Sequence, residues 1–184
     1  MQVTPLSIPD VKLLAPARHG DDRGFFSETW SRRTYEAKGV DAAWVQDNHA
    51  WSRDRGVLRG LHFQIGAAAQ TKLVRVTRGS VFDVAVDLRR SSPTYGRFVT
   101  AVLSARDWNQ LLVPKGFAHG YVTLEPDTEF LYKVDAFYSP ENDRGILWND
   151  PTLAIPWPVG PAEVQLSGKD KVLPAFADLP AYFP

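Results

Sequence analysis

The sequence contains no cysteine, and this absence excludes several classes of protein. A chain without thiols cannot be cross-linked by disulfides, use a thiolate nucleophile or bind zinc through cysteine. It also lacks an apolar run of the roughly 18 residues that a membrane-spanning helix needs. The first residues show no basic stretch followed by an apolar one, as a secretion signal would. We therefore expect a cytoplasmic protein without a membrane partner.

The sequence also has no excess of positive or negative charge. Lysine and arginine together number 21, as do aspartate and glutamate, so the overall field does not favour nucleic acid as a partner. No glycine-rich fingerprint of a dinucleotide-binding domain is present, and we expect no nicotinamide cofactor. A length of 184 residues predicts one domain over 1–184, large enough for a full hydrophobic core.

Prolines and glycines, 14 and 13 in number, separate many short apolar runs. Short apolar runs separated by turn residues favour an all-β fold, either a sandwich or a closed barrel. Strands are predicted at residues 57–64, 70–78, 81–88, 99–103, 110–113, 120–124 and 129–138. One short helix is expected over 31–38, with Ser31 as its N-cap and Gly39 as its stop. The proline-rich tail, 151–184, should wrap the surface with little regular structure.

Four histidines could transfer protons near neutral pH. His19 lies in a run of loop composition and is interpreted as exposed. His49 is interpreted as a turn residue, with a place in a pocket wall as the alternative. His62 lies in a strand-like run and His119 where a turn leads into a strand. Each of these two could be catalytic, or could be a structural histidine satisfied by its neighbours.

The spacing Pro-x-Gly-x-x-His at residues 114–119 also suggests a metal site, because metal-binding barrels of the cupin class carry a histidine ligand in this setting. Such a site needs three or four converging ligands. The companion His-x-His with a nearby glutamate is missing, since His62 is followed by Phe63 and Gln64 and then by small apolar residues. We therefore expect no metal.

Other residues suit proton transfer and anion binding. Period two places Tyr132 and Tyr138 on one face of the predicted strand 129–138, either as core residues or as a proton donor and a ring that stacks on a base. Lys72 lies on an otherwise apolar face, a position that requires a polar pocket or a barrel mouth. The residues that could hold a diphosphate are Arg23, Arg59 and Lys169.

Eight short motifs occur in an order that is specific to one family. They are DDRGFF (21–26), QDN (46–48), VLRGLHFQ (57–64), KLVRV (72–76), FDVAVD (82–87), PKGFAHG (114–120), WNDP (148–151) and LSGKD (166–170). Over nearly the whole chain, to about residue 170, the sequence resembles the dTDP-4-dehydrorhamnose 3,5-epimerases. The resemblance implies a jelly-roll barrel of the cupin type with short peripheral helices, and a homodimer. It also implies a dTDP-linked 4-keto-6-deoxysugar as substrate.

Position by position, the resemblance implies His62 as general base, Asp170 as the group that orients and charges its ring, and Tyr132 as general acid. Lys72 would stabilise the enolate oxygen at C4. The remaining residues implied to contact substrate are Arg23, Glu28, Gln46, Asp47, Asn48, Arg59, His119, Tyr138 and Lys169. Residues 141–145 are one residue longer than the family's pattern, so we assign no acidic contact there.

These residue types suit inversion of carbons beside a ketone. Removing a proton from C3 or C5 gives an enolate on the C4 oxygen, which a fixed cation stabilises. Inversion then needs a base on one face of the sugar and a proton donor on the other. One conflict concerns Arg59 and His62, which would point to opposite faces of a straight strand. A bulge at Gly60, or donation of Arg59 to a neighbouring subunit's site, would resolve it.

Three alternatives are considered beside this function. A relative could invert only one of the two carbons with the same acid–base residues. A metal-dependent cupin enzyme is disfavoured by the missing ligands. A sugar-nucleotide binding module would not need an opposed acid and base.

Overall fold

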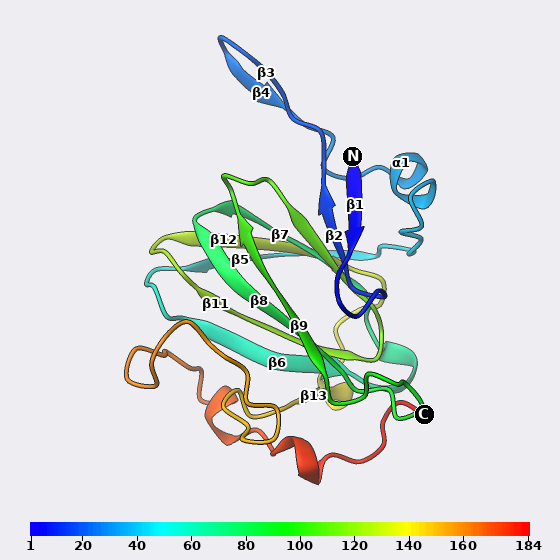
Figure 1. The fold of residues 1–184 in the computed structure, drawn as a ribbon, viewed down its shortest axis with the longest axis vertical. Coiled ribbons are helices and arrows are strands. Elements are labelled where there is room, and N and C mark those ends of the chain that lie inside the picture. Colours follow the sequence, from blue (N-terminus) through cyan, green and yellow to red (C-terminus); the bar gives the residue numbers. More distant parts are fainter.

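The computed structural model describes all 184 residues as two antiparallel sheets that face each other, with a long C-terminal segment against one of them (Figure 1). One sheet has the strand order β1-β2-β10-β7-β12-β5 and the other β13-β6-β11-β8-β9. The first sheet consists of β1 (Gln2–Pro5), β2 (Lys12–Ala15), β10 (Gln110–Val113), β7 (Lys72–Arg78), β12 (Thr128–Val134) and β5 (Gln46–Ser52). The second consists of β13 (Asp143–Gly145), β6 (Leu58–Gln64), β11 (Phe117–Thr123), β8 (Ser80–Asp87) and β9 (Phe98–Ser104).

Most of the predicted strands are confirmed, and one was predicted too long. The run 129–138 leaves the sheet after Val134, so Tyr138 is not on the strand that carries Tyr132. The Asp135 side chain accepts a hydrogen bond from the backbone N–H of Thr71 at 2.7 Å, which takes the place of continued strand pairing. Strand β5 was missed, and His49, interpreted as a turn residue, lies in the middle of it.

The main core fills the space between the sheets. Its members are apolar and almost fully buried, among them Val74, Val76, Val81, Leu111 and Phe130. They alternate along their strands with residues of the outer faces, as the period-two pattern requires. A second apolar cluster, which includes Val84, Val86 and Phe176, lies between the five-stranded sheet and the C-terminal segment. Strand β8 is therefore buried on both faces.

The C-terminal segment contains only short 3-10 turns, as its proline content predicts: η3 (Asp170–Val172) and η4 (Phe176–Asp178). A parallel bridge joins Val57 to Gln165, and another joins Arg89 to Phe183. Further 3-10 turns elsewhere are η1 (Gly66–Ala68) and η2 (Pro140–Asn142). The segment thus follows the five-stranded sheet closely enough to carry Asp170 to the end of the barrel.

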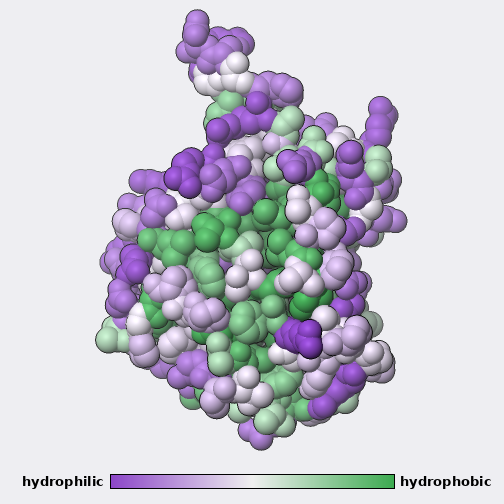
Figure 2. Space-filling model, in the orientation of Figure 1, coloured by the Kyte–Doolittle hydropathy of each residue, from purple (hydrophilic) through white to green (hydrophobic).

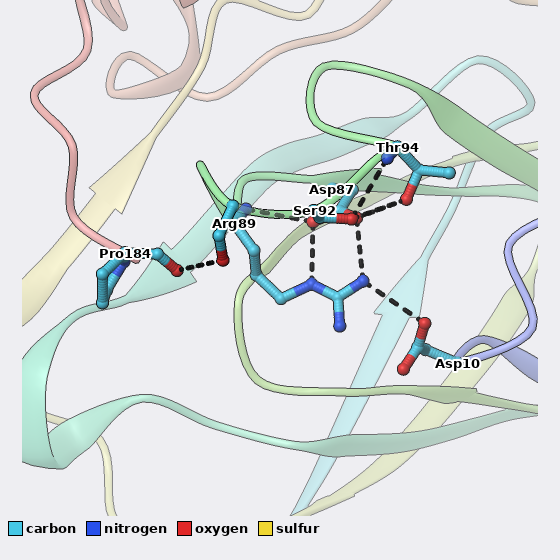
Figure 3. A network of polar contacts seen from close by, with 7 residues as sticks. Asp10, Asp87, Arg89, Ser92, Thr94 and Pro184 are labelled. Carbon is cyan, nitrogen blue, oxygen red and sulfur yellow. Dashed lines mark hydrogen bonds and ion pairs between the residues drawn. The ribbon is translucent and has the colours of Figure 1, made fainter.

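A polar network fixes the end of this segment (Figure 3). The buried carboxylate of Asp87 accepts hydrogen bonds from the Arg89 guanidinium at 2.8 and 2.9 Å and from the hydroxyls of Ser92 and Thr94 at 2.6 Å each. The Arg89 guanidinium also reaches Asp10, 3.3 Å away. Next to it, the hydroxyl of Ser91 donates to the carbonyl of Pro184. The network therefore joins both ends of the chain to β8.

A two-stranded hairpin projects from the body of the molecule (Figure 1). It consists of β3 (His19–Asp21) and β4 (Gly24–Phe26), and it exposes Phe25 and Phe26 by 53% and 73%. Figure 2 shows mainly hydrophilic residues on the hairpin, while hydrophobic ones gather on the body of the same face, where β9 runs. At its base the hairpin contacts the body of the molecule through Phe25, whose ring packs edge-on against Trp108 with centroids 4.8 Å apart.

The helix predicted over 31–38 is confirmed in a shorter form, α1 (Arg32–Glu36). Ser31 is its N-cap, since its hydroxyl accepts a hydrogen bond from the Thr34 N–H, and Gly39 follows with φ +72°. None of the helices has the length and apolar character that crossing a membrane requires.

Candidate active site

A cavity of about 480 Å³ opens between the two sheets at one end of the barrel. Six residues singled out in the sequence line it together: Arg59, His62, Lys72, His119, Tyr132 and Asp170. Strands β6 and β11 of one sheet supply one wall, and β7 and β12 of the other sheet supply the opposite wall. Two sheets and the C-terminal segment must therefore come together to form the site.

His62 lies on β6 and is hydrogen-bonded to a carboxylate from the C-terminal segment. Its Nε2 is 2.5 Å from Oδ1 of Asp170, whose other oxygen accepts a hydrogen bond from the Ser167 hydroxyl at 2.9 Å. Burial would raise the pKa of Asp170, but the hydrogen bonds from His62 and Ser167 lower it below the ordinary value. An ionised carboxylate at Nε2 holds the ring proton there and leaves Nδ1 free to accept a proton.

His119 forms a second such pair deeper in the barrel. Its Nε2 lies 2.9 Å from the carboxylate of Asp83, and both side chains are buried. Burial raises the pKa of Asp83, although the neighbouring His119 ring opposes that shift. Asp83 lies in the motif FDVAVD, but no role was predicted for it from the sequence. Its position in the apolar run 81–88 was the available signal, because a buried acid on such a strand requires a partner.

Lys72 begins β7 on the wall opposite His62. Burial lowers the pKa of its ammonium to about 8, while the carboxylates of Asp143 and Asp83 raise it in part. The ammonium makes no ion pair with any side chain of the protein. A cation in a low-dielectric cavity without a fixed counter-ion is suited to stabilise negative charge on a ligand.

Tyr132 lies on β12, on the wall opposite His62. Burial raises the pKa of its phenol, with the Arg59 guanidinium opposing this, so the hydroxyl remains protonated near neutral pH. A neutral phenol in this place can donate a proton or a hydrogen bond to a ligand held between the walls.

A bulge in β6 resolves the conflict between Arg59 and His62. The ladder pairs His119 with His62 and Tyr121 with Arg59, so two steps along β11 match three along β6. The extra residue lies at Gly60 and Leu61, and it turns Arg59 and His62 toward the same cavity. Gly60 allows this, because a Cβ there would come within 2.5 Å of the Gly120 Cα.

Of the residues expected at the nucleotide, Gln46, Asn48 and Tyr138 lie together beside the cavity side of β5, and Asp47 does not. Tyr138 is 57% exposed, and its backbone N–H donates to the Gln46 side chain at 3.2 Å. Gln46 also donates to Asn48, and period two places both on the face of β5 that carries the cavity residue Ala50. Asp47 points to the other face, where it pairs with Lys133 at 2.8 Å. Its carboxylate therefore does not face the cavity.

An acid at the rim was missed by the sequence analysis. Asp143, on β13, is paired with Lys169 and accepts a hydrogen bond from the Tyr138 hydroxyl at 3.3 Å. It lies in the run 141–145, to which no contact was assigned. The pairing of β13 with Gln64 and His62 on β6, which brings Asp143 to the rim, depends on the fold rather than on any local signal.

Two of the expected substrate contacts lie away from this cavity. Arg23 is at the tip of the projecting hairpin, where it pairs with Asp21 and its side chain is 90% exposed. Glu28 accepts hydrogen bonds from Ser31 and Thr34 at the start of α1. The structure does not bring either residue to the cavity of its own chain.

The structure contains no cluster of three or more His, Cys, Asp or Glu side chains that could hold a metal ion. The charged groups of the cavity instead form His–carboxylate pairs beside a separate lysine.

Comparison with known proteins decides the family. The sequence profile of the dTDP-4-dehydrorhamnose 3,5-epimerases matches residues 5–178. The chain belongs to this family. An enzyme of that name from Pseudomonas aeruginosa is 55% identical over 179 residues, which cover 97% of both chains.

Solved structures agree with this assignment. An epimerase from Bacillus anthracis with TDP and pyrophosphate bound has a TM-score of 0.92 and 50% identity, covering 95% of this chain and 98% of its own. An epimerase from Legionella pneumophila in complex with dTDP-4-keto-L-rhamnose has a TM-score of 0.93 and 43% identity, covering 98% and 95%. The all-β fold predicted as a cupin-type jelly roll is thereby confirmed.

Proposed function

We propose that this chain converts dTDP-4-dehydro-6-deoxy-D-glucose to dTDP-4-dehydro-L-rhamnose by inverting C3 and C5. The observation that carries this proposal is the placement of a His–Asp pair and a protonated tyrosine on opposite walls of one cavity, with a cationic side chain between the sheets. Family membership supports the substrate.

His62 is the general base of the proposed reaction. Asp170 holds the proton on Nε2, so Nδ1 removes the proton from C3 or C5 of the sugar. The carboxylate then stabilises the positive ring that results. The electron pair of the broken C–H bond forms a C=C bond between that carbon and C4 of the sugar, and negative charge appears on the C4 oxygen.

Lys72 stabilises that enolate, and Tyr132 completes the inversion. The Lys72 ammonium, which faces the cavity, interacts more strongly with the charged oxygen than with the ketone, and this difference lowers the barrier. Tyr132 then delivers a proton to the carbon from the face opposite His62. His62 then releases its proton to solvent and Tyr132 takes one up from solvent, and repeating the sequence at the second carbon gives the doubly inverted product.

The nucleotide occupies the rim in this proposal. Tyr138 stacks on the thymine ring, and Gln46 and Asn48 contact the nucleoside from β5. Arg59 and Lys169 bind the diphosphate, with His119 below them contacting the sugar. A nucleotide sugar is produced and consumed where nucleoside triphosphates are, which supports the expected cytoplasmic location.

The projecting hairpin supports a homodimer. It exposes Phe25 and Phe26 and holds Arg23 away from the body of its own chain, so the hairpin tip contributes nothing to the cavity of its own subunit. We infer that it lies against the partner subunit and brings Arg23 to the partner's cavity. Glu28, at the base of the same segment, would approach that site as well.

Mixing two defective variants tests this arrangement. Arg23→Ala and His62→Asn should each be strongly impaired alone. After subunit exchange the heterodimer has one site with both residues intact, so activity should recover to about a quarter of wild type. No recovery from an exchanged mixture, or a monomeric mass at micromolar concentration, would contradict the dimer and the role of Arg23.

Product analysis tests the reaction itself. We expect the NMR spectrum of the product to show inversion at both carbons, and turnover to survive chelation and be unchanged by added nicotinamide cofactor. Inversion at one carbon alone would assign a single-carbon epimerase. Turnover lost with a chelator and restored by one metal would indicate a metal-dependent enzyme, and binding without turnover would indicate a binding module.

A further inference from the structure

One buried polar side-chain atom in the whole chain has no hydrogen-bond partner, and it belongs to a residue of the cavity. This atom is the hydroxyl of Tyr121, a residue that is 4% exposed. Leaving a buried hydroxyl without a partner is unfavourable, so native proteins rarely do it without a functional reason. The proposed acid–base mechanism does not use Tyr121.

Packing fixes the position of this side chain. Tyr121 follows His119 by two residues on β11 and therefore faces the cavity with it. Its ring is stacked on Phe130 from the opposite sheet, with centroids 3.9 Å apart and planes at 17°. The ring cannot turn to find another partner without breaking this stack, so a partner has to come to the hydroxyl.

Arg59 is the group placed to do so. The ladder pairs Arg59 on β6 directly with Tyr121 on β11, and the bulge at Gly60 turns Arg59 toward the cavity. Its side chain is exposed and forms no ion pair, and its one hydrogen bond is a long contact of 3.3 Å to the carbonyl of Trp51. Burial raises the pKa of Tyr121, and the Arg59 side chain opposes this rise through its charge and through its approach to the hydroxyl, which stops short of hydrogen-bond geometry. The phenol is thus a neutral acceptor beside a loosely held guanidinium.

We propose that Tyr121 is a positioning residue for Arg59. When an anionic ligand enters, Arg59 leaves the Trp51 carbonyl and donates one N–H to the Tyr121 hydroxyl, and its other N–H groups bind the diphosphate. A planar guanidinium with five donors can bind both partners at once. This inference rests on the proposed function, because it takes a nucleoside diphosphate sugar as the ligand.

The test measures the affinity for dTDP by calorimetry in wild type, Tyr121→Phe, Arg59→Ala and the double variant. Tyr121→Phe should weaken binding about three- to tenfold, with the melting temperature unchanged or raised, since a hydroxyl without a partner is removed. In the Arg59→Ala background the same change should have no further effect, because the hydroxyl acts only through the guanidinium. In turnover, KM should rise while kcat stays near wild type.

Tyr35→Phe is the matched control. The Tyr35 hydroxyl is also buried, but it bonds the Thr29 carbonyl at 2.6 Å and the Gln110 side chain at 2.8 Å. Its loss should lower the melting temperature and leave dTDP affinity unchanged.

Two results would overturn the inference. One is wild-type affinity in Tyr121→Phe, and the other is a loss that adds fully to that of Arg59→Ala, which would mean that Tyr121 acts independently of Arg59. Failure of the wild-type protein to bind dTDP would instead contradict the proposed function.

Discussion

The role of His62 depends on its hydrogen bond to Asp170, and replacing the ring tests that role. His62→Asn should slow hydrogen exchange at both carbons by a factor of about 10²–10⁴ or more, which leaves almost none to detect. Substrate affinity should change little. His49→Asn is the matched control, since His49 pairs with Glu129 on the outer face of β5, away from the cavity. Exchange in deuterated water, followed by NMR, is the measurement. Near-normal exchange in His62→Asn would make His62 a structural histidine.

Tyr132 is the proposed source of the new proton. Tyr132→Phe keeps the ring, so the packing against Phe130 at 6.0 Å should persist. His62 can still remove a proton and return deuterium to the same face, so exchange should continue with retention and little epimer should form. Deuterium content and product stereochemistry are read from one sample. Normal inversion in the Phe variant would exclude Tyr132 as the acid.

Loss of the Lys72 charge should set the alkaline limb of the kcat/KM profile against pH. Burial lowers the pKa of its ammonium to about 8, so the cationic fraction falls as the pH rises through that value. Stabilisation of the enolate requires the cation, and kcat/KM should therefore decline above about pH 8. The pKa of Tyr132 is raised, so its phenol does not account for a limb there. A flat kcat/KM profile from pH 7 to well above 9 would contradict the role of Lys72.

At this scale, the sequence predicted the residues whose chemistry the motifs specify. The family resemblance of these motifs placed His62, Lys72, Tyr132 and Asp170 in one site, although Asp170 is 108 residues from His62. It could not reveal Asp83 as the partner of His119, because this pairing depends on two strands becoming neighbours. The unpartnered hydroxyl of Tyr121 was also beyond reach, since an absent hydrogen bond becomes visible only when all neighbours are placed.

At the scale of elements, the network around Asp87 holds the C-terminal segment to β8. Burial would raise the pKa of Asp87, but hydrogen bonds from Arg89, Ser92 and Thr94 lower it to about 2. The folded pKa lies below the unfolded value, so this stabilisation is complete above about pH 4 and is lost as the pH falls toward 2.

Asp87→Asn should therefore lower the free energy of unfolding at pH 7 by about 2 kcal/mol and reduce its decline between pH 4 and 2. Asp127→Asn is the control, because Asp127 makes only an exposed pair with Arg78 at 3.7 Å. Urea unfolding at pH 7 and pH 3 provides the measurement. Equal stability of wild type and Asp87→Asn at both values would contradict the account of this network.

Elements with strong apolar alternation could be predicted, and those without it could not. The run 81–88 shows the pattern and is β8, within one residue at either end. Strand β5 is an edge strand of polar residues, so its sequence resembles a turn. The three-residue strands β3 and β4 are too short for a periodic signal, and the bulge at Gly60 required the pairing with β11.

At the scale of the whole molecule, two sheets, the C-terminal segment and the proposed partner hairpin all contribute to one reaction. In the proposed mechanism each supplies a different group: β6 the base, β12 the acid, β7 the cation, and the C-terminal segment the carboxylate that orients the base. An acid and a base on opposite walls are needed only if a proton leaves a carbon from one face of the sugar and a new one arrives on the other face.

The wild-type reaction with dTDP-4-dehydro-6-deoxy-D-glucose in deuterated water tests that claim most directly. NMR of the product reports deuterium and configuration at C3 and C5 together. We expect deuterium at both carbons, both in the inverted configuration. Inverted product without solvent deuterium, or deuterium confined to one carbon, would contradict two proton transfers across opposite walls of this cavity.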